Sequence, residues 1–169
     1  MENERKRIRL RDYDYGEIGC YFITICADKR RPIFSRIIPG NAHTITEVRL
    51  SPIGSVIQKH IQCIPRLYPD ITIDHYVIMP NHVHLLISVH KESRQEDRSK
   101  MLIPKIIQSL KASVTKEIPI AFRPVWQTRY YDHVIRDASD FQIKWQYIQN
   151  NPVKWVEDSY YLQDGESCR

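Results

Sequence analysis

The stretch from Asp70 to His90, DITIDHYVIMPNHVHLLISVH, decides which fold to expect for this chain. It holds two runs rich in β-branched and aromatic residues, and Pro80-Asn81 separates them. Such runs predict strands, and a short break of turn-forming residues predicts that the two strands pair in antiparallel fashion. We therefore expect a β-sheet that contains this hairpin.

Segments on the N-terminal side extend the pattern. CYFITICA (residues 20–27) predicts a strand, and SPIGSVIQKHIQCIPRLYP (51–69) predicts a helix that Ser51 caps. Between them, DKRRPIF (28–34) and IIPGNAH (37–43) are expected to be loop, and TITEVRL (44–50) a short edge strand.

The C-terminal side completes the order of elements. MLIPKIIQSLKASVTKEI (101–118) has the period of an amphipathic helix, YYDHVIR predicts the last strand, and ASDFQIKWQYIQNNP predicts a final helix capped by Ser139 or Asp140. Strand, helix, strand, strand, helix, strand and an extra helix predict an α+β fold. We expect a ferredoxin-like split βαβ antiparallel sheet with two helices on one face.

Composition bounds the class of protein. The chain has 169 residues, 42% apolar and 27% charged, which predicts one globular domain over residues 1–169. Within it we expect a basic N-terminal arm (1–19), an exposed loop (91–100) and a short C-terminal tail (156–169). The four cysteines form no C-x-x-C pair and no run suits a membrane span or a secretory signal, so a cytoplasmic protein is expected. The net charge of +5 is compatible with a polyanionic partner.

Two histidines, His82 and His84, share one face of the predicted strand 82–89. Alternate residues of a strand point to opposite faces, so the helices should cover the apolar set and the histidines should face the side that the first two helices leave open. Two imidazoles roughly 6.5–7 Å apart at Cα can share one divalent ion. The alternative is that the two histidines are incidental polar residues of the sheet. The predicted apolar set is Val83, Leu85, Ile87 and Val89, and the opposite set is His82, His84, Leu86 and Ser88.

The final helix carries a second pair, Tyr147 and Asn151, one turn apart on one face and next to Lys144. Alone, the two would be an aromatic at the edge of the core and a helix end before Pro152. Combined with the histidines, they suit metal-assisted phosphoryl transfer. A divalent cation draws charge off a phosphodiester, and a tyrosine that attacks phosphorus stores the bond as an ester that can be rejoined.

At this point the chain resembles the HUH-type single-tyrosine transposases, and is most similar to their REP-associated tyrosine transposase (transposase-like) branch. The resemblance extends in the family's order from Tyr21 to Trp155, most of the chain. The matching pieces are YFITICADKRRPIF, DHYVIMPNHVHLLISV, VWQTRYYDHVIRDASDF and WQYIQNNPVKW.

The resemblance implies a role for each member of the set. It implies that His82, His84 and Asn151 bind Mg²⁺ or Mn²⁺, and that Tyr147 is the catalytic nucleophile of the final helix. Imidazole ligands alone would also suit zinc or nickel. Family members cut single-stranded DNA beside short hairpins and leave a 5′-phosphotyrosine and a free 3′-hydroxyl. The expected function is therefore a single-stranded DNA endonuclease and strand transferase.

Two other functions stay open on the sequence. One is a domesticated, sequence-specific DNA-hairpin binder with little or no strand transfer. The other is a metal-dependent phosphodiesterase for RNA or small nucleotides, which would leave Tyr147 without a role. The expected partner is single-stranded DNA with a hairpin, so the protein would be nucleoid-associated when bound. The sequence does not decide between a homodimer and a monomer.

DNA contacts are predicted at basic and aromatic positions. Basic side chains suit phosphates, and aromatic rings suit stacking on unpaired bases. Trp126, Tyr130 and Tyr131 are candidates for stacking, and Arg129 and His133 for lining the site. The candidates for phosphate contacts include Arg7, Arg9, Lys105, Lys111 and Lys144.

Overall fold

A computed structural model of the protein describes residues 18–41, 45–90 and 102–157. The loop expected at 91–100 lies outside the described residues. So do all but the last two residues of the arm expected at 1–19, including Arg7 and Arg9, and all but the first two of the tail expected at 156–169.

A four-stranded antiparallel sheet forms the centre of the fold. Its strands lie in the order β4 (Ile71–Ile78), β5 (His82–Val89), β1 (Gly19–Cys26) and β6 (Tyr131–Ile135). Strand β5 pairs with both β4 and β1, and β6 pairs with the other side of β1. In a split βαβ arrangement the first strand lies between the hairpin and the last strand, and β1 lies in that place between β5 and β6. The predicted α+β fold is confirmed.

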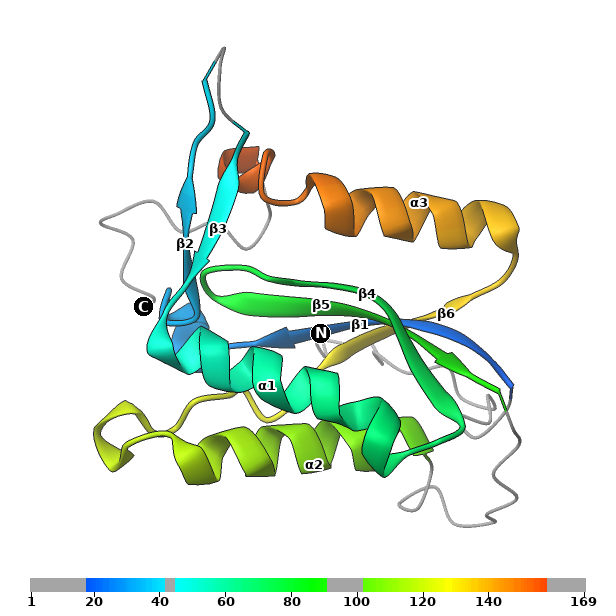
Figure 1. Ribbon diagram of the computed structural model, residues 1–169, viewed down its shortest axis with the longest axis horizontal. Helices are drawn as coiled ribbons and strands as arrows, with labels where there is room; N and C mark the ends of the chain where they lie inside the picture. Colours follow the sequence, from blue (N-terminus) through cyan, green and yellow to red (C-terminus); the bar gives the residue numbers. More distant parts are fainter. Residues whose placement is uncertain (1–17, 42–44, 91–101, 158–169) are drawn as a thin grey trace, which may run out of the picture.

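Helices cover the two faces of the sheet unequally. The helices α1 (Pro52–Leu67) and α2 (Leu102–Glu117) lie together on one face, and α3 (Ala138–Asn150) crosses the other (Figure 1). The predicted cap of α1 is confirmed, because the Ser51 hydroxyl accepts a hydrogen bond from the Gly54 N–H at 3.0 Å.

The predicted cap of α3 is wrong. Asp137 caps the helix, since its carboxylate accepts the Asp140 N–H at 2.9 Å and its backbone is extended. Asp140 instead accepts the Arg136 N–H at 3.1 Å and lies 2.8 Å from His133 Nε2. Any of several polar residues can cap a helix, and tertiary contacts selected the earlier one.

The connection between β1 and α1 also differs from expectation. It forms a separate two-stranded sheet of β2 (Ser35–Ile38) and β3 (Glu47–Leu50), so residues 37 and 38 are strand and β3 is no edge of the main sheet. The hairpin projects beyond the end of the sheet (Figure 1). Short 3₁₀ helices lie in other connections: η1 (Asp28–Arg30), η3 (Ile120–Phe122) and η4 (Trp155–Glu157).

The main core lies between the sheet and the pair α1 and α2. It is built largely of isoleucine, with the inward residues of β1 and β5 packed on both helices. The opposite face carries a smaller cluster in which Phe22 and Leu86 contact Ile148 of α3. The predicted alternation of β5 is therefore confirmed. Among the described residues, no helix is long and apolar enough to span a membrane.

Candidate active site

The two histidines lie side by side where β5 begins, on the face that α3 covers. Their Nε2 atoms are 3.0 Å apart, and their rings meet edge to face with centroids 4.5 Å apart. Both side chains are buried, with 0% exposure for His82 and 1% for His84. Burial of two adjacent imidazoles in a sheet requires that each ring nitrogen be satisfied.

The Nδ1 atom of each ring has a hydrogen-bond partner. His82 Nδ1 lies 2.9 Å from Asn81 Oδ1, and because an amide oxygen only accepts, His82 donates here and keeps its Nε2 lone pair. His84 Nδ1 lies 2.8 Å from Thr24 Oγ1. The Thr24 hydroxyl can donate or accept, so His84 can carry its proton on either nitrogen. One tautomer donates its Nε2–H to His82, and the other frees both Nε2 lone pairs.

His84 is held in its neutral form. Burial lowers the pKa of His84 well below its ordinary value, and the neighbouring His82 and Lys144 lower it further. A neutral imidazole is the form that binds a metal ion. His84 is therefore in the form that could bind a metal ion over the neutral pH range.

The donor set fits a divalent cation. A metal ion bound about 2.1 Å from each nitrogen, at adjacent corners of an octahedron, needs the two nitrogens about 3.0 Å apart. The Nε2 separation of 3.0 Å matches this distance. Asn81 and Thr24 orient the rings as outer partners commonly do around metal-binding histidines. Within the described part of the chain, no group of three His, Cys, Asp or Glu side chains could hold a metal, so a third ligand from these residues would be of another type.

Helix α3 brings Tyr147 to the histidine pair. The ring of Tyr147 lies 5.2 Å from that of His84 and 5.8 Å from that of Phe22, measured between centroids. Its side chain remains 41% exposed. The phenol therefore sits beside the histidines and stays accessible to a substrate.

Asn151 ends α3 as its C-cap and is buried. The chain on either side of it contacts the pair, since Tyr147 packs beside His84 and Trp155 of η4 lies 5.9 Å from His82 between ring centroids. Asn151 is thus in the turn that joins these two contacts. The structure brings His82, His84 and Tyr147 together at one end of one sheet face, and Asn151 follows Tyr147 by one helical turn.

No family model matches the chain. An uncharacterized protein of Haemophilus influenzae is 32% identical to it over 95% of this chain and 94% of that protein. A second H. influenzae protein, named "Putative REP-associated tyrosine transposase", is 30% identical over 46% of this chain and 47% of that protein.

A solved structure of a REP-associated tyrosine transposase bound to a REP hairpin has the same fold. Its TM-score is 0.61, with 22% identity over 87% of this chain and 73% of that chain. The chain is therefore similar to REP-associated tyrosine transposases over part of its sequence and in its fold. The resemblance inferred from the histidine and tyrosine motifs is confirmed.

The basic residues predicted to contact DNA fall into different places. Lys144 lies at the site, with Nζ 5.1 Å from the centroid of the Phe22 ring. Arg129 is exposed just before β6. Lys105 and Lys111 belong to α2, on the far side of the sheet from the histidines (Figure 1).

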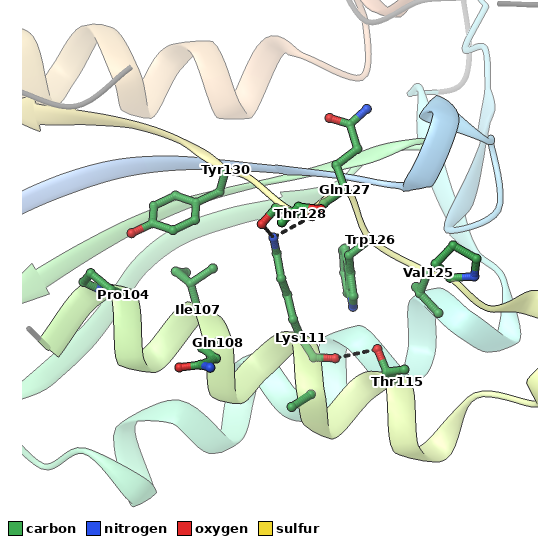
Figure 2. Close-up of a pocket in the computed structure, with 12 residues that line it drawn as sticks. Pro104, Ile107, Gln108, Lys111, Thr115, Val125, Trp126, Gln127, Thr128 and Tyr130 are labelled. Carbon is green, nitrogen blue, oxygen red and sulfur yellow. Dashed lines mark hydrogen bonds between the residues drawn. The ribbon is translucent and has the colours of Figure 1, made fainter. Parts of the chain in front are cut away.

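Lys111 has a structural role that the sequence did not suggest. Its Nζ donates to the backbone carbonyls of Gln127 and Thr128 at 2.8 and 3.2 Å (Figure 2). It also donates to the carbonyl of Arg129 at 3.2 Å. The half-buried Tyr130 ring lies 5.9 Å from the same Nζ. The ammonium therefore fixes the segment that leads into β6.

Other residues around the site were missed or differ in role. Sequence reasoning missed Thr24 and Asn81 as partners of the histidines. His133, predicted to line the site, pairs with Asp140 and holds the first turn of α3 to β6. Asn81 precedes His82 directly and is a signal that the sequence offered. Thr24 needed the register of β1 against β5, in which it stands opposite His84.

Proposed function

We propose that this protein cuts and rejoins single-stranded DNA beside short hairpins, with Tyr147 as the nucleophile. His82, His84 and Asn151 would hold the divalent cation, Mg²⁺ or Mn²⁺. The observation that carries the proposal is the 3.0 Å Nε2 pair with the Tyr147 ring 5.2 Å from that of His84. A related protein of the same fold was solved with a REP hairpin bound, which supports DNA as the substrate.

The reaction needs few groups. When bound, the cation would polarise the scissile phosphodiester and neutralise charge on its oxygens. Tyr147, its phenol proton lost to water, attacks phosphorus, and the bond from phosphorus to the 3′-oxygen breaks. The 3′-oxygen takes up a proton, which leaves a 5′-phosphotyrosine and a 3′-hydroxyl. Attack of another 3′-hydroxyl on the ester reverses these steps and joins the strands.

The remaining residues would position the imidazole rings and the tyrosine and attract the DNA phosphates. Asn81 and Thr24 fix the two imidazole rings, so the cation would meet a preformed pair of ligands. Lys144 lies one turn before Tyr147, and its ammonium attracts the phosphate oxygens to the same end of the sheet. The small apolar cluster of Phe22, Leu86 and Ile148 holds α3, and with it the tyrosine, against the sheet.

Covalent capture tests the proposal. The whole protein is incubated with labelled single-stranded DNA that contains a hairpin, with Mn²⁺, and run on a denaturing gel. We expect a protein–DNA adduct that disappears with chelator and in Tyr147→Phe. Tyr68→Phe is the matched control, because Tyr68 packs against the core at the end of α1. Cleavage that persists undiminished in Tyr147→Phe would sink the covalent mechanism.

A second candidate is a hairpin-binding protein without strand transfer, which the hairpin complex of the related structure also favours. It predicts tight DNA binding with no adduct under any metal. A binder has no need for a buried histidine pair beside an exposed tyrosine, so the enzyme is the better supported of the two.

A further inference from the structure

A cavity of about 730 Å³ lies between α2 and residues 124–130, the segment that leads into β6 (Figure 2). This volume is within the range of small-molecule sites. Its walls are mostly apolar. Pro104 and Ile107 of α2 form one side, and Pro124, Val125 and Trp126 form the other.

Trp126 brings a buried hydrogen-bond donor to this cavity. Its side chain is only 9% exposed, and Nε1 is fully buried with no hydrogen-bond partner among the described residues. An indole nitrogen can only donate, so the missing partner must be an acceptor. In Figure 2 the nitrogen end of the ring points across the cavity toward α2.

The donor is held rigidly in place. Trp126 forms a β-bridge with Ala27, and its ring packs on Phe34 with centroids 4.9 Å apart. The next residue, Gln127, donates its N–H to the Cys26 carbonyl at 3.0 Å. On the other side, Lys111 Nζ ties down residues 127–129. The cavity is therefore a built feature of the fold.

The register of the sheet relates this cavity to the active site. Thr24 of β1 stands opposite His84 on one side and opposite Tyr131 on the other, so Tyr131 shares the face of the histidines. Two strand spacings, about 10 Å, separate Tyr131 from His84. Tyr130 precedes it, points the other way and lines the cavity. A nucleic acid strand that leaves the site across β6 reaches the cavity by passing round the edge of the sheet.

We propose that this cavity binds one unpaired nucleobase of the DNA strand whose phosphodiester lies at the histidine pair. The inference rests on the proposed function, because it takes that DNA as the ligand. A nucleobase is flat, so it suits the apolar walls, and its edge carries carbonyl or ring-nitrogen acceptors for the Trp126 N–H. Pairing in a duplex hides part of that edge, so the cavity selects an unpaired base.

Indole NMR signals test the contact directly. The whole protein, as Tyr147→Phe to prevent cleavage, is labelled with ¹⁵N and titrated with hairpin DNA that has single-stranded flanks. Its three tryptophans give three indole signals, and Trp126→Phe identifies the one of interest. We expect this signal to move as the N–H gains an acceptor.

An abasic scan identifies the base. Single abasic sites are placed in turn at each unpaired position, and binding is measured by anisotropy. One position should lose roughly tenfold in affinity, the effect of one buried hydrogen bond and its stacking. In Trp126→Phe the intact DNA should bind correspondingly weaker, and the same abasic site should cost little more. Ala112→Trp, which fills the cavity and keeps the donor, should reproduce the loss, whereas Gln62→Trp on the exposed side of α1 should not.

The outcomes separate the two proposals. If wild-type protein forms the Tyr147 adduct but the Trp126 signal stays fixed and no abasic position stands out, the cavity is not a base site and the proposed function survives. If wild-type protein neither binds nor cuts hairpin DNA, both proposals fail.

Discussion

The two faces of the central sheet come from the same strands and are both buried where β5 begins, yet they differ in chemistry. On β5, Leu85 and Ile87 are fully buried beneath α1 and α2, and His82 and His84 are buried to the same extent on the side of α3. One face is a wall of aliphatic side chains. The other carries hydrogen-bonded imidazoles and a threonine hydroxyl.

The difference teaches how this fold combines rigidity with a polar site. The apolar face supplies most of the hydrophobic burial, and a smaller cluster of Phe22, Leu86 and Ile148 packs the third helix on the other face. His75 adds to that attachment, because its ring stacks on Trp145 at 4.4 Å and its Nε2–H donates to Gln149 at 3.1 Å. One face therefore supplies most of the packing and the other carries the polar site, although neighbouring residues of one strand contribute to both.

The strongest test of this division replaces His84 by glutamine. The substitution keeps a polar side chain of similar length but removes an imidazole ligand from the pair. Loss of metal assistance is worth several kcal/mol of barrier, so the adduct should form roughly a thousandfold more slowly. The free energy of unfolding should change by no more than about 1.5 kcal/mol. Single-turnover adduct formation and urea denaturation measure the two effects; an unchanged adduct rate would remove His84 from the site.

The neighbouring residue should give the opposite result. Leu85→Ala removes a fully buried side chain from the apolar face, and such truncations cost about 2–5 kcal/mol of stability. Adduct formation per folded molecule, measured well below the melting temperature, should stay near that of the wild type. A thousandfold loss of activity in Leu85→Ala would show that the two faces are not separable.

Much of this division could be predicted from the sequence, because it depends on short-range periodicity. Alternation along 82–89 assigned His84 and Leu85 to opposite faces, and helical spacing placed Tyr147 and Asn151 on one side of α3. Each of these depends on neighbours within one turn or one pleat. The order of strands and helices also predicted the sheet topology, because few arrangements of such elements are allowed.

The features that the sequence could not predict depend on contacts between distant segments. Thr24 meets His84 only through the register of β1 on β5, 60 residues apart in the chain. The partner of β3 is β2 and not the main sheet, a choice that local propensity does not contain. Lys111 looked like a phosphate contact because its sequence context shows a charge and not the three carbonyls 16–18 residues away.

Lys111 allows a test of smaller effect, on the helix beneath the apolar face. In Lys111→Met three carbonyls lose their donor, which should cost about 1–3 kcal/mol of unfolding free energy. Lys105→Met is the matched control, since Lys105 is exposed on the same helix and its loss should stay within about 0.5 kcal/mol. Guanidinium denaturation compares them. Equal effects of the two substitutions would mean that the Lys111 contacts contribute nothing net.

The smallest predicted effect is a pH dependence of the unfolding free energy, which should come from the histidine face and not from the apolar face. The pKa of His84 is held well below 6.5 in the folded protein, first by burial and then by His82 and Lys144. As the pH falls through 6.5, unfolded chains take up a proton at His84 that folded ones refuse, so stability falls with acidification and is constant for this group above that value. Between pH 6.5 and 5.5 the metal-free protein should lose about 1 kcal/mol through this residue. Urea denaturation in chelator measures the loss, and His84→Gln should remove that share of it while Leu85→Ala leaves it unchanged. An identical pH dependence in wild type and His84→Gln would mean that the imidazole is protonated as easily when folded as when unfolded.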